Sequence, residues 1–280
     1  MPIDNLWAFV IFYDIIISIC ILHIEIKEEY IMNLVQKIFK KKERRQPFGG
    51  IDTYNTEPTL IKEYKNIDSK LLKKYGNSQS FNKSIKLLIF ADTHGHISID
   101  PDYNFKIIPN DIDACILLGD ISKNDIEVIL RHIEKDKIFG ILGNHDYDTN
   151  LSDFNIPNIN GTIKEINGIK FAGFEGCIKY KEIQPGYSLE DGFKMAKELE
   201  ATDICITHAP PFGGAGMNHN SIHIGVPYVN EYIYKNHCPI VICGHNHVDY
   251  IHELSNGTKV IGTYKQRIIE INNMNITSIY

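Results

Sequence analysis

The sequence changes character at residue 86, where it reads Lys86-Leu87-Leu88-Ile89-Phe90-Ala91-Asp92-Thr93-His94. This stretch is a short apolar run that ends abruptly in polar side chains. A continuous apolar run of about 4–8 residues with polar boundaries is typical of a strand that is buried on both faces. The same pattern recurs at residues 114–118, 138–142, 204–206 and 240–243. The sequence therefore predicts a set of buried strands from residue 86 onward.

Helical patterns lie between these apolar runs. Residues 125–135 place four apolar side chains on one face of a helix, and residues 189–199 follow the capping box Ser188-Leu189-Glu190-Asp191. Asn-Gly pairs at 160–161, 167–168 and 256–257 predict tight turns, and hence hairpins in the middle and at the C-terminal end. We therefore predict an α/β (α+β) fold with mixed sheets, two of which pack face to face.

The composition excludes several classes of protein. With 43% hydrophobic and 23% charged residues over 280 positions, the chain is close to the average of folded globular proteins, so global disorder is excluded. The net charge of -6 provides no field that would gather a polyanion, so we expect no stable nucleic-acid complex. The six cysteines are scattered without a CxxC pair, which favours buried thiols in a reducing compartment.

The sequence predicts three parts. Residues 1–45 form an apolar segment followed by a basic cluster, residues 46–84 form a linker with one helix at 61–75, and residues 85–280 form the strand-rich domain. Within the first part, residues 6–24 are almost continuously apolar, and six Lys or Arg side chains follow between positions 37 and 45.

Two interpretations of the N-terminal segment stay open. In the first, it is a membrane anchor. Asp14 then adds about 3 kcal/mol to the free energy of membrane insertion, whereas the Leu, Ile, Val and Phe residues together contribute about -5 kcal/mol. Insertion is then marginally favourable, and the basic cluster keeps the remainder of the chain in the cytosol. Alternatively, Met32 is the true start and residues 1–31 are not translated. The expected location is cytoplasmic, with a membrane-anchored form as the alternative.

Side chains that bind metal ions in proteins directly follow the predicted strands. Because the C-terminal ends of strands in open α/β sheets form one crevice, we expect these side chains to converge. The set combines imidazole and carboxylate groups without a thiolate, which suits Mn, Fe, Zn, Ni or Co better than Ca or Mg. Its members are Asp92, His94, Asp120, Asn144, His145, Asp146, His208, His245 and His247.

The ordered motifs D-x-H, G-D, G-N-H-D, T-H-A-P-P and G-H-N-H at these positions resemble those of the calcineurin-like metallophosphoesterase superfamily. The resemblance covers about residues 86–272 and implies a β-sandwich flanked by helices. It further implies one divalent ion bound by Asp92, His94 and His247 and a second bound by Asn144, His208 and His245. Asp120 would bridge both ions, His145 would donate a proton, and Asp146 would orient His145.

The reaction implied is hydrolysis of phosphodiesters or nucleotide-type phosphate esters through a metal-bridging hydroxide. Two ions clamp the attacking and leaving oxygens and lower the pKa of a bound water, and we expect Mn2+ or an Fe/Zn pair. Their charge, less that of two aspartates and one hydroxide, leaves about +1 to attract a small-molecule phosphate ester. Residues 121–123 are Ile-Ser-Lys, without the Tyr and Arg of the protein Ser/Thr phosphatases, which disfavours that activity.

Two other functions stay open. One is a membrane-associated pyrophosphate hydrolase, which the apolar N-terminus favours. The other is a non-catalytic scaffold on the same fold, against which the complete motif argues. We also expect the Gly-rich loop Pro210–Pro227, which carries His219 and His223, to overhang the crevice and contact the substrate.

Overall fold

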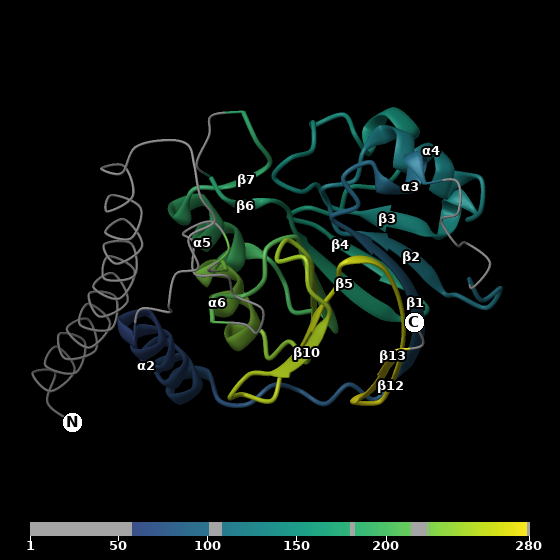
Figure 1. Cartoon of the computed structure of the whole chain (residues 1–280). Helices are drawn as coiled ribbons and strands as arrows, with labels where there is room; N and C mark the ends of the chain where they lie inside the picture. The colour runs from purple at the N-terminus through teal and green to yellow at the C-terminus, as the bar shows by residue number, and fades with distance from the viewer. Residues whose placement is uncertain (1–57, 101–107, 180–182, 214–222, 224, 279–280) are drawn as a thin grey trace, which may run out of the picture. The chain divides into compact units, whose positions relative to one another are not determined.

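The computed structural model describes residues 58–100, 108–179, 183–213, 223 and 225–278 (Figure 1). The chain divides into two units, residues 1–53 and 54–280, and all described residues belong to the second. The expected membrane anchor at 6–24, the basic cluster after it and the alternative start at Met32 therefore lie outside the described residues. In the part of the chain that is described, no helix is long and apolar enough to cross a membrane.

Two large mixed sheets form the centre of the second unit, as predicted. The first sheet has 5 strands in the order β13-β12-β1-β2-β3, and the second has 6 strands in the order β10-β11-β9-β8-β5-β4. A separate 2-stranded sheet consists of β6 and β7. The strands are β1 Ser84–Ala91, β2 Ala114–Leu117, β3 Ile138–Gly140, β4 Ile163–Ile166, β5 Ile169–Phe174, β6 Cys177–Ile178, β7 Gly186–Tyr187, β8 Ile204–Thr207, β9 Ile240–Cys243, β10 Tyr250–Glu253, β11 Lys259–Gly262, β12 Lys265–Asn272 and β13 Asn275–Ser278.

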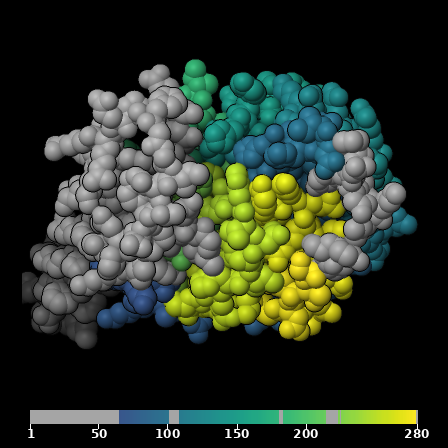
Figure 2. All heavy atoms as spheres, in the orientation of Figure 1, coloured from purple at the N-terminus to yellow at the C-terminus, as the bar shows by residue number. Residues whose placement is uncertain are grey.

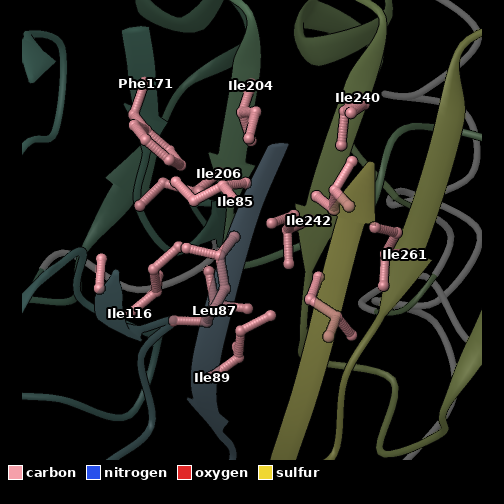
Figure 3. Close-up of a cluster of buried hydrophobic side chains, with 14 of the residues drawn as sticks. Ile85, Leu87, Ile89, Ile116, Phe171, Ile204, Ile206, Ile240, Ile242 and Ile261 are labelled. Atoms are coloured by element: carbon pink, nitrogen blue, oxygen red, sulfur yellow. The ribbon is translucent and has the colours of Figure 1, made fainter. Parts of the chain in front are cut away.

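The two large sheets pack against each other over an apolar core (Figure 3). Side chains alternate along β1, so that Leu87 and Ile89 face the second sheet whereas Leu88 and Phe90 face the opposite way. The second sheet contributes Phe171, Ile204, Ile206, Ile240, Ile242 and Ile261 to the same core. All five cysteines that the structure describes are free and buried, as predicted for thiols used as small apolar side chains.

Helices cover the outer faces of both sheets (Figure 1). On the first sheet, α4 buries Ile126 and Ile129 in the same apolar layer as Phe90. On the second sheet, the ring of Tyr232 in α6 meets the ring of Phe174 at 5.1 Å between centroids. The helices are α2 Pro58–Tyr75, α3 His96–Ile99, α4 Lys123–Leu130, α5 Leu189–Glu198 and α6 Pro227–Lys235, with short 3-10 turns at Lys135–Lys137 and Ser152–Phe154.

The direction of the strands brings the ends of several strands together. β1, β2 and β3 run parallel to one another, and so do β5, β8 and β9. Backbone hydrogen bonds join the loops that follow them: the Asp92 amide donates to Gly119 O at 3.0 Å, and the Gly244 amide donates to His208 O at 3.0 Å. Figure 2 draws all heavy atoms in the orientation of Figure 1. It shows the yellow C-terminal residues on the surface beside the blue residues that follow β1.

Two local predictions were wrong. The helix expected over 125–135 ends at Leu130, because the amides of Arg131 and His132 donate to carbonyls three residues back and tighten the last turn. Ile133 stays buried in the same layer, which extends the apolar periodicity beyond the helix. The Asn160–Gly161 pair forms the predicted tight turn, in which the Thr162 amide donates to Ile159 O at 3.0 Å, but this turn closes no hairpin. It lies beside β5 instead, where the Gly161 amide donates to Gly173 O at 2.9 Å. The other two Asn-Gly pairs join β4 to β5 and β10 to β11 in antiparallel hairpins, as predicted.

Ile116, which is fully buried between the sheets, tests this packing. We expect Ile116→Ala to lower the free energy of unfolding by about 2–5 kcal/mol, because the cavity is lined by neighbours that collapse only partly. The control Lys194→Ala, on the exposed face of α5, should change it by less than about 0.5 kcal/mol. Urea unfolding of the metal-stripped proteins, followed by circular dichroism, measures both. A loss below about 1 kcal/mol for Ile116→Ala would contradict tight packing between the sheets.

Candidate metal centre

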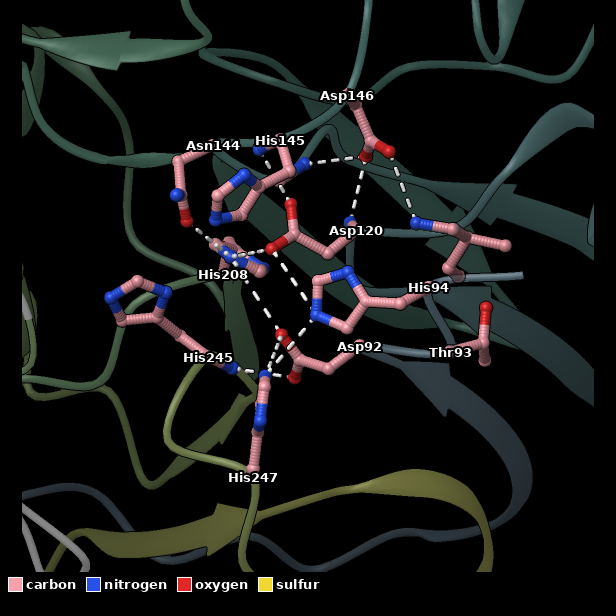
Figure 4. Close-up of polar contacts among 12 residues, drawn as sticks. Asp92, Thr93, His94, Asp120, Asn144, His145, Asp146, His208, His245 and His247 are labelled. Carbon is pink, nitrogen blue, oxygen red and sulfur yellow. Dashed lines mark hydrogen bonds and ion pairs between the residues drawn. The ribbon is translucent and has the colours of Figure 1, made fainter. Parts of the chain in front are cut away.

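The predicted site residues converge at the C-terminal ends of five strands, which are parallel within each sheet: β1, β2 and β3 in the first and β8 and β9 in the second (Figure 4). The carboxylates of Asp92 and Asp120 lie at the centre, with His94 on one side and Asn144 and His245 on the other. β1 delivers Asp92 and His94, β2 delivers Asp120, β3 delivers Asn144, His145 and Asp146, β8 delivers His208, and β9 delivers His245 and His247. The convergence that the sequence predicts is therefore present.

The backbone at these strand ends is held in an unfavourable conformation. Asp92, His94, Asp120, His245 and His247 have φ values of 53°, 47°, 54°, 69° and 55°. Residues other than glycine rarely adopt positive φ, and such strain clusters at functional sites. Gly119 shows why the loops are so tight: a Cβ there would lie 2.2 Å from the Gly143 nitrogen. The turns after β2 and β3 therefore touch through their backbones, which draws Asp120 and Asn144 together.

Asp92 and Asp120 are buried almost completely, at 0% and 3% exposure. Asp92 Oδ2 accepts a hydrogen bond from the His245 amide at 2.7 Å, and Asp120 Oδ1 accepts one from the His145 amide at 2.7 Å. Asp92 Oδ1 has no hydrogen-bond partner among the described residues. Its closest imidazole nitrogens, His247 Nε2 and His208 Nε2, are 3.6 and 4.0 Å away, beyond normal hydrogen-bond length. A buried carboxylate oxygen without a donor is costly unless a cation satisfies it.

His208 lies between these carboxylates. Its Nδ1 is 2.7 Å from Leu118 O and its Nε2 is 3.0 Å from Asn144 Oδ1, so both ring nitrogens face oxygen atoms. Burial lowers the pKa of His208, but Asp120, 3.5 Å away, and Asp92 more than offset this and raise the pKa to about 9. Burial likewise opposes ionisation of Asp120, yet His208 holds the Asp120 pKa well below its ordinary value.

His94 and His247 form a second pair of imidazoles, with their Nε2 atoms 3.2 Å apart. Two nitrogens that bind one ion at about 2.1 Å are about 3.0–3.4 Å apart, so this separation fits a shared ion. Partial burial lowers the pKa of His94, whereas the contact with Asp92 raises the pKa of His247. The ring of Tyr264 stacks on His247, with centroids 5.0 Å apart, and supports it from the outer side.

The described residues fit a dinuclear metal centre. Asp92, His94 and His247 offer ligand atoms that all lie within 4.8 Å of one another, and Asp92, Asp120 and His208 do the same. The orphaned oxygen Asp92 Oδ1 belongs to the residue that both groups share. His245 adjoins the second group through its ring, which packs edge-on against His208 at 4.9 Å. The donor set of imidazole, carboxylate and amide oxygen suits transition metals.

The carboxylate of Asp146 faces the backbone of two loops. Its Oδ2 accepts the amides of Asp120 and Gly143 at 2.8 and 2.7 Å, and its Oδ1 accepts the Ile121 amide and Asn150 Nδ2, both at 3.0 Å. These four bonds occupy the lone pairs of the carboxylate. Burial and the charge of Asp120 raise the pKa of Asp146 to about 7, against the effect of the amide donors. Asp146 thus fixes the turns that carry Asp120 and His145.

Sequence reasoning missed Asp125, a fully buried carboxylate behind the first loop. Asp125 accepts hydrogen bonds from Thr93 Oγ1 at 2.6 Å and from the amides of Gly95 and Ser98 at 2.8 and 2.7 Å. It therefore fixes the loop that carries Asp92 and His94. A signal was present, because Ser122 and Asp125 have capping-box spacing, and the Asp125 amide donates to Ser122 Oγ at 3.1 Å.

The loop between Pro210 and Pro227 is described only in part, and His219 lies outside the described residues. His223 is described, and its ring stacks on His245 with centroids 4.6 Å apart. On the other side of the site, a cleft of about 410 Å³ opens beside His94, Asp120 and His145. The site is thus reachable from solvent on the side of His145.

The sequence pattern of the calcineurin-like phosphoesterases matches residues 85–249. The fold is similar to that of the protein TT1561 from Thermus thermophilus, at 14% identity and a TM-score of 0.50, over 70% of this chain and 98% of that chain. A dimetal phosphatase from Danio rerio is similar at 10% identity and a TM-score of 0.43, over 70% of this chain and 98% of its own.

A putative 5'-nucleotidase from Staphylococcus aureus matches at 14% identity and a TM-score of 0.42, over 70% of this chain and 53% of that chain. No curated protein matches this chain in sequence. Since the family pattern covers more than half of the chain, including every strand end that carries a site residue, the chain belongs to the calcineurin-like phosphoesterases, a family of phosphoester hydrolases that generally bind a dinuclear centre of divalent metal ions.

Proposed function

We propose that this chain hydrolyses phosphodiesters or nucleotide-type phosphate esters with two divalent metal ions. One observation carries the proposal: two buried aspartates lie within reach of converging imidazoles, and Asp92 Oδ1 has no donor among the described residues. Removing two carboxylates from water is unfavourable unless positive charge offsets them. The protonated ring of His208 offsets only part of this charge.

The proposed ligands divide into two sets with one shared member. Asp92, His94 and His247, whose ligand atoms lie within 4.8 Å of one another, would hold the first ion. Asn144, His208 and His245 would hold the second, and Asp120 would be shared. On loading, His208 would give up the proton on Nε2 while Nδ1 keeps its hydrogen bond to Leu118 O, which fixes the orientation of the ring.

Mn2+ or an Fe/Zn pair suits this donor set best. When bound, two such ions polarise the phosphoryl oxygens and make hydroxide available near neutral pH. Asn144 would bind through a neutral amide oxygen, so it adds coordination without cancelling the positive charge that attracts phosphate.

His145 would act as the proton donor to the leaving oxygen. It is exposed on the cleft, and its backbone amide is held by Asp120 Oδ1 at 2.7 Å. A positioned general acid contributes about 10²–10⁴-fold in rate. Asp146 would be a positioning residue, because it fixes the backbone on both sides of His145 through the amides of Gly143 and Asp120.

The proposal is tested by hydrolysis of bis-p-nitrophenyl phosphate and p-nitrophenyl phosphate. Metal-stripped protein should recover turnover when Mn2+, Fe2+ or Zn2+ is restored, with the diester preferred over the monoester. Asp120→Asn should remain inactive, whereas Asp136→Asn, the same change at an exposed position, should keep full activity. Two bound metals without turnover of either ester would contradict the proposal and favour a scaffold.

The neighbours Asn144 and His145 should fail in different ways. We expect Asn144→Ala to lose one bound metal ion and most turnover, whereas His145→Ala keeps both ions and turns over about 10²–10⁴-fold more slowly. The deficit of His145→Ala should be smaller for a p-nitrophenyl ester than for an alkyl ester, because p-nitrophenolate leaves without needing a proton. Metal analysis by mass spectrometry and steady-state rates measure both effects. Equal metal loss in the two variants would contradict their separate roles.

Metal affinity should depend on pH. Because the pKa of His208 is raised to about 9, a metal ion competes with a proton below that pH. The apparent affinity for Mn2+ should rise between about pH 6.5 and 8.5 by up to about tenfold per unit for one displaced proton. Calorimetric titration in buffers of different ionisation enthalpy reports both affinity and proton release. An affinity that does not change over this range would show that His208 carries no proton in the metal-free protein.

A further inference from the structure

The cleft of about 410 Å³ lies on one side of the candidate metal centre. Its lining includes His94, Asp120 and His145, and the rest of its wall comes from the start of α4 and the loop after β3. That wall contains Ser122, Lys123, Asn124, Tyr147 and Asn150. Since His145 is the proposed proton donor, the group that leaves phosphorus lies on the side of this cleft.

Tyr147 stands out in this wall because it is a large aromatic side chain that is 77% exposed. A single exposed aromatic residue is common on protein surfaces and has no meaning alone. Here, however, the ring lines a cleft and follows His145 by two positions. It therefore offers a flat apolar face within a short distance of the reacting groups.

The loop that carries Tyr147 is held in place by polar contacts. Asn150 donates through its backbone amide to Tyr147 O at 2.9 Å and through Nδ2 to Ile121 O at 3.0 Å. Lys123 Nζ donates to Thr149 Oγ1 at 2.7 Å and pairs with Asp153. These contacts join the loop to the start of α4. The backbone that carries Tyr147 is therefore held before a ligand arrives, which lowers the entropy that the loop loses on binding.

The chemistry of the wall selects the leaving group. The charge of Lys123 is paired with Asp153, so a second phosphate finds no unpaired cation among the described residues of this wall. A lipid tail would need a continuous apolar lining, and Tyr147 is the one large apolar face among the described residues there. Ser122 and Asn124 offer a hydroxyl and an amide group that bind sugar hydroxyls and the edge of a base. A nucleoside, which is a flat base joined to a neutral sugar, matches the paired charge of Lys123, the single aromatic face of Tyr147 and the polar groups of this wall.

We infer that the cleft binds the leaving group of the substrate and that this leaving group is a nucleoside whose base stacks on Tyr147. The inference rests on the proposed phosphoesterase function and specifies its substrate class. In the reaction, water supplies the oxygen that bonds to phosphorus, and the bond between phosphorus and the nucleoside oxygen breaks. The leaving oxygen takes a proton from His145, and the proton released by water restores it.

A mixed diester, the methyl ester of thymidine 5'-monophosphate, tests which group leaves. Cleavage with the nucleoside in the cleft gives thymidine and methyl phosphate, whereas the opposite orientation gives thymidine monophosphate and methanol. We expect thymidine to dominate with the wild-type protein and with Tyr147→Phe. In Tyr147→Ala the ratio of thymidine to thymidine monophosphate should fall about tenfold, because base stacking on an aromatic ring is lost. The ratio is independent of metal loading.

A monoester pair that differs only in its leaving group gives a second test. Tyr147→Ala should lower kcat/KM about tenfold for adenosine 5'-monophosphate and less than about twofold for glycerol 3-phosphate. Saturation-transfer NMR with adenosine and metal-stripped protein should show base protons for wild type and Tyr147→Phe and lose them for Tyr147→Ala.

Different results would overturn the phosphoesterase function and the nucleoside leaving group. If bis-p-nitrophenyl phosphate is not hydrolysed with metals restored, the proposed function is wrong. If it is hydrolysed, but the mixed diester is not cleaved, gives mainly thymidine monophosphate, or gives the same product ratio in all three proteins, the nucleoside inference is overturned.

Discussion

The burial of two carboxylates at adjoining strand ends governs this structure. Asp92 and Asp120 have almost no contact with solvent, and a buried charge is stable only when it is paired and hydrogen-bonded. The imidazolium of His208 and the amides of His145 and His245 satisfy most of their oxygens. Asp92 Oδ1 is the exception among the described residues. The arrangement thus favours the binding of cations by an acidic chain, and bound cations attract phosphate.

The sheets and two supporting carboxylates hold the loops of the site in this unfavourable arrangement. Parallel strands in both sheets end at the same edge, which brings the loops together, and residues other than glycine adopt positive φ where β1, β2 and β9 end. Such strain costs about 1–3 kcal/mol per residue and persists only where the surroundings fix it. Asp125 and Asp146 do this by accepting loop amides, each from behind a strand end.

Most of the fold and the membership of the site could be predicted from the sequence, because each apolar run coincides with a buried strand and each run is followed by its polar side chains. The end of α4 at Leu130 could not, since Ile133 continues the apolar spacing after the helix has closed. Three of the four partners of Asp146 were beyond prediction because they are backbone amides, which no motif records. The cleft wall of Tyr147 and Lys123 depends on how two loops pack, and that is a tertiary property.

Anomalous diffraction from crystals grown with Mn2+ locates bound ions without reference to activity, so it decides whether these side chains hold two metal ions. We expect two manganese peaks per chain that share Asp120, one beside His94 and His247 and the other beside Asn144 and His208, with Asp92 Oδ1 in contact with an ion. A single peak, or peaks away from these side chains with Asp92 Oδ1 still unsatisfied, would contradict this expectation.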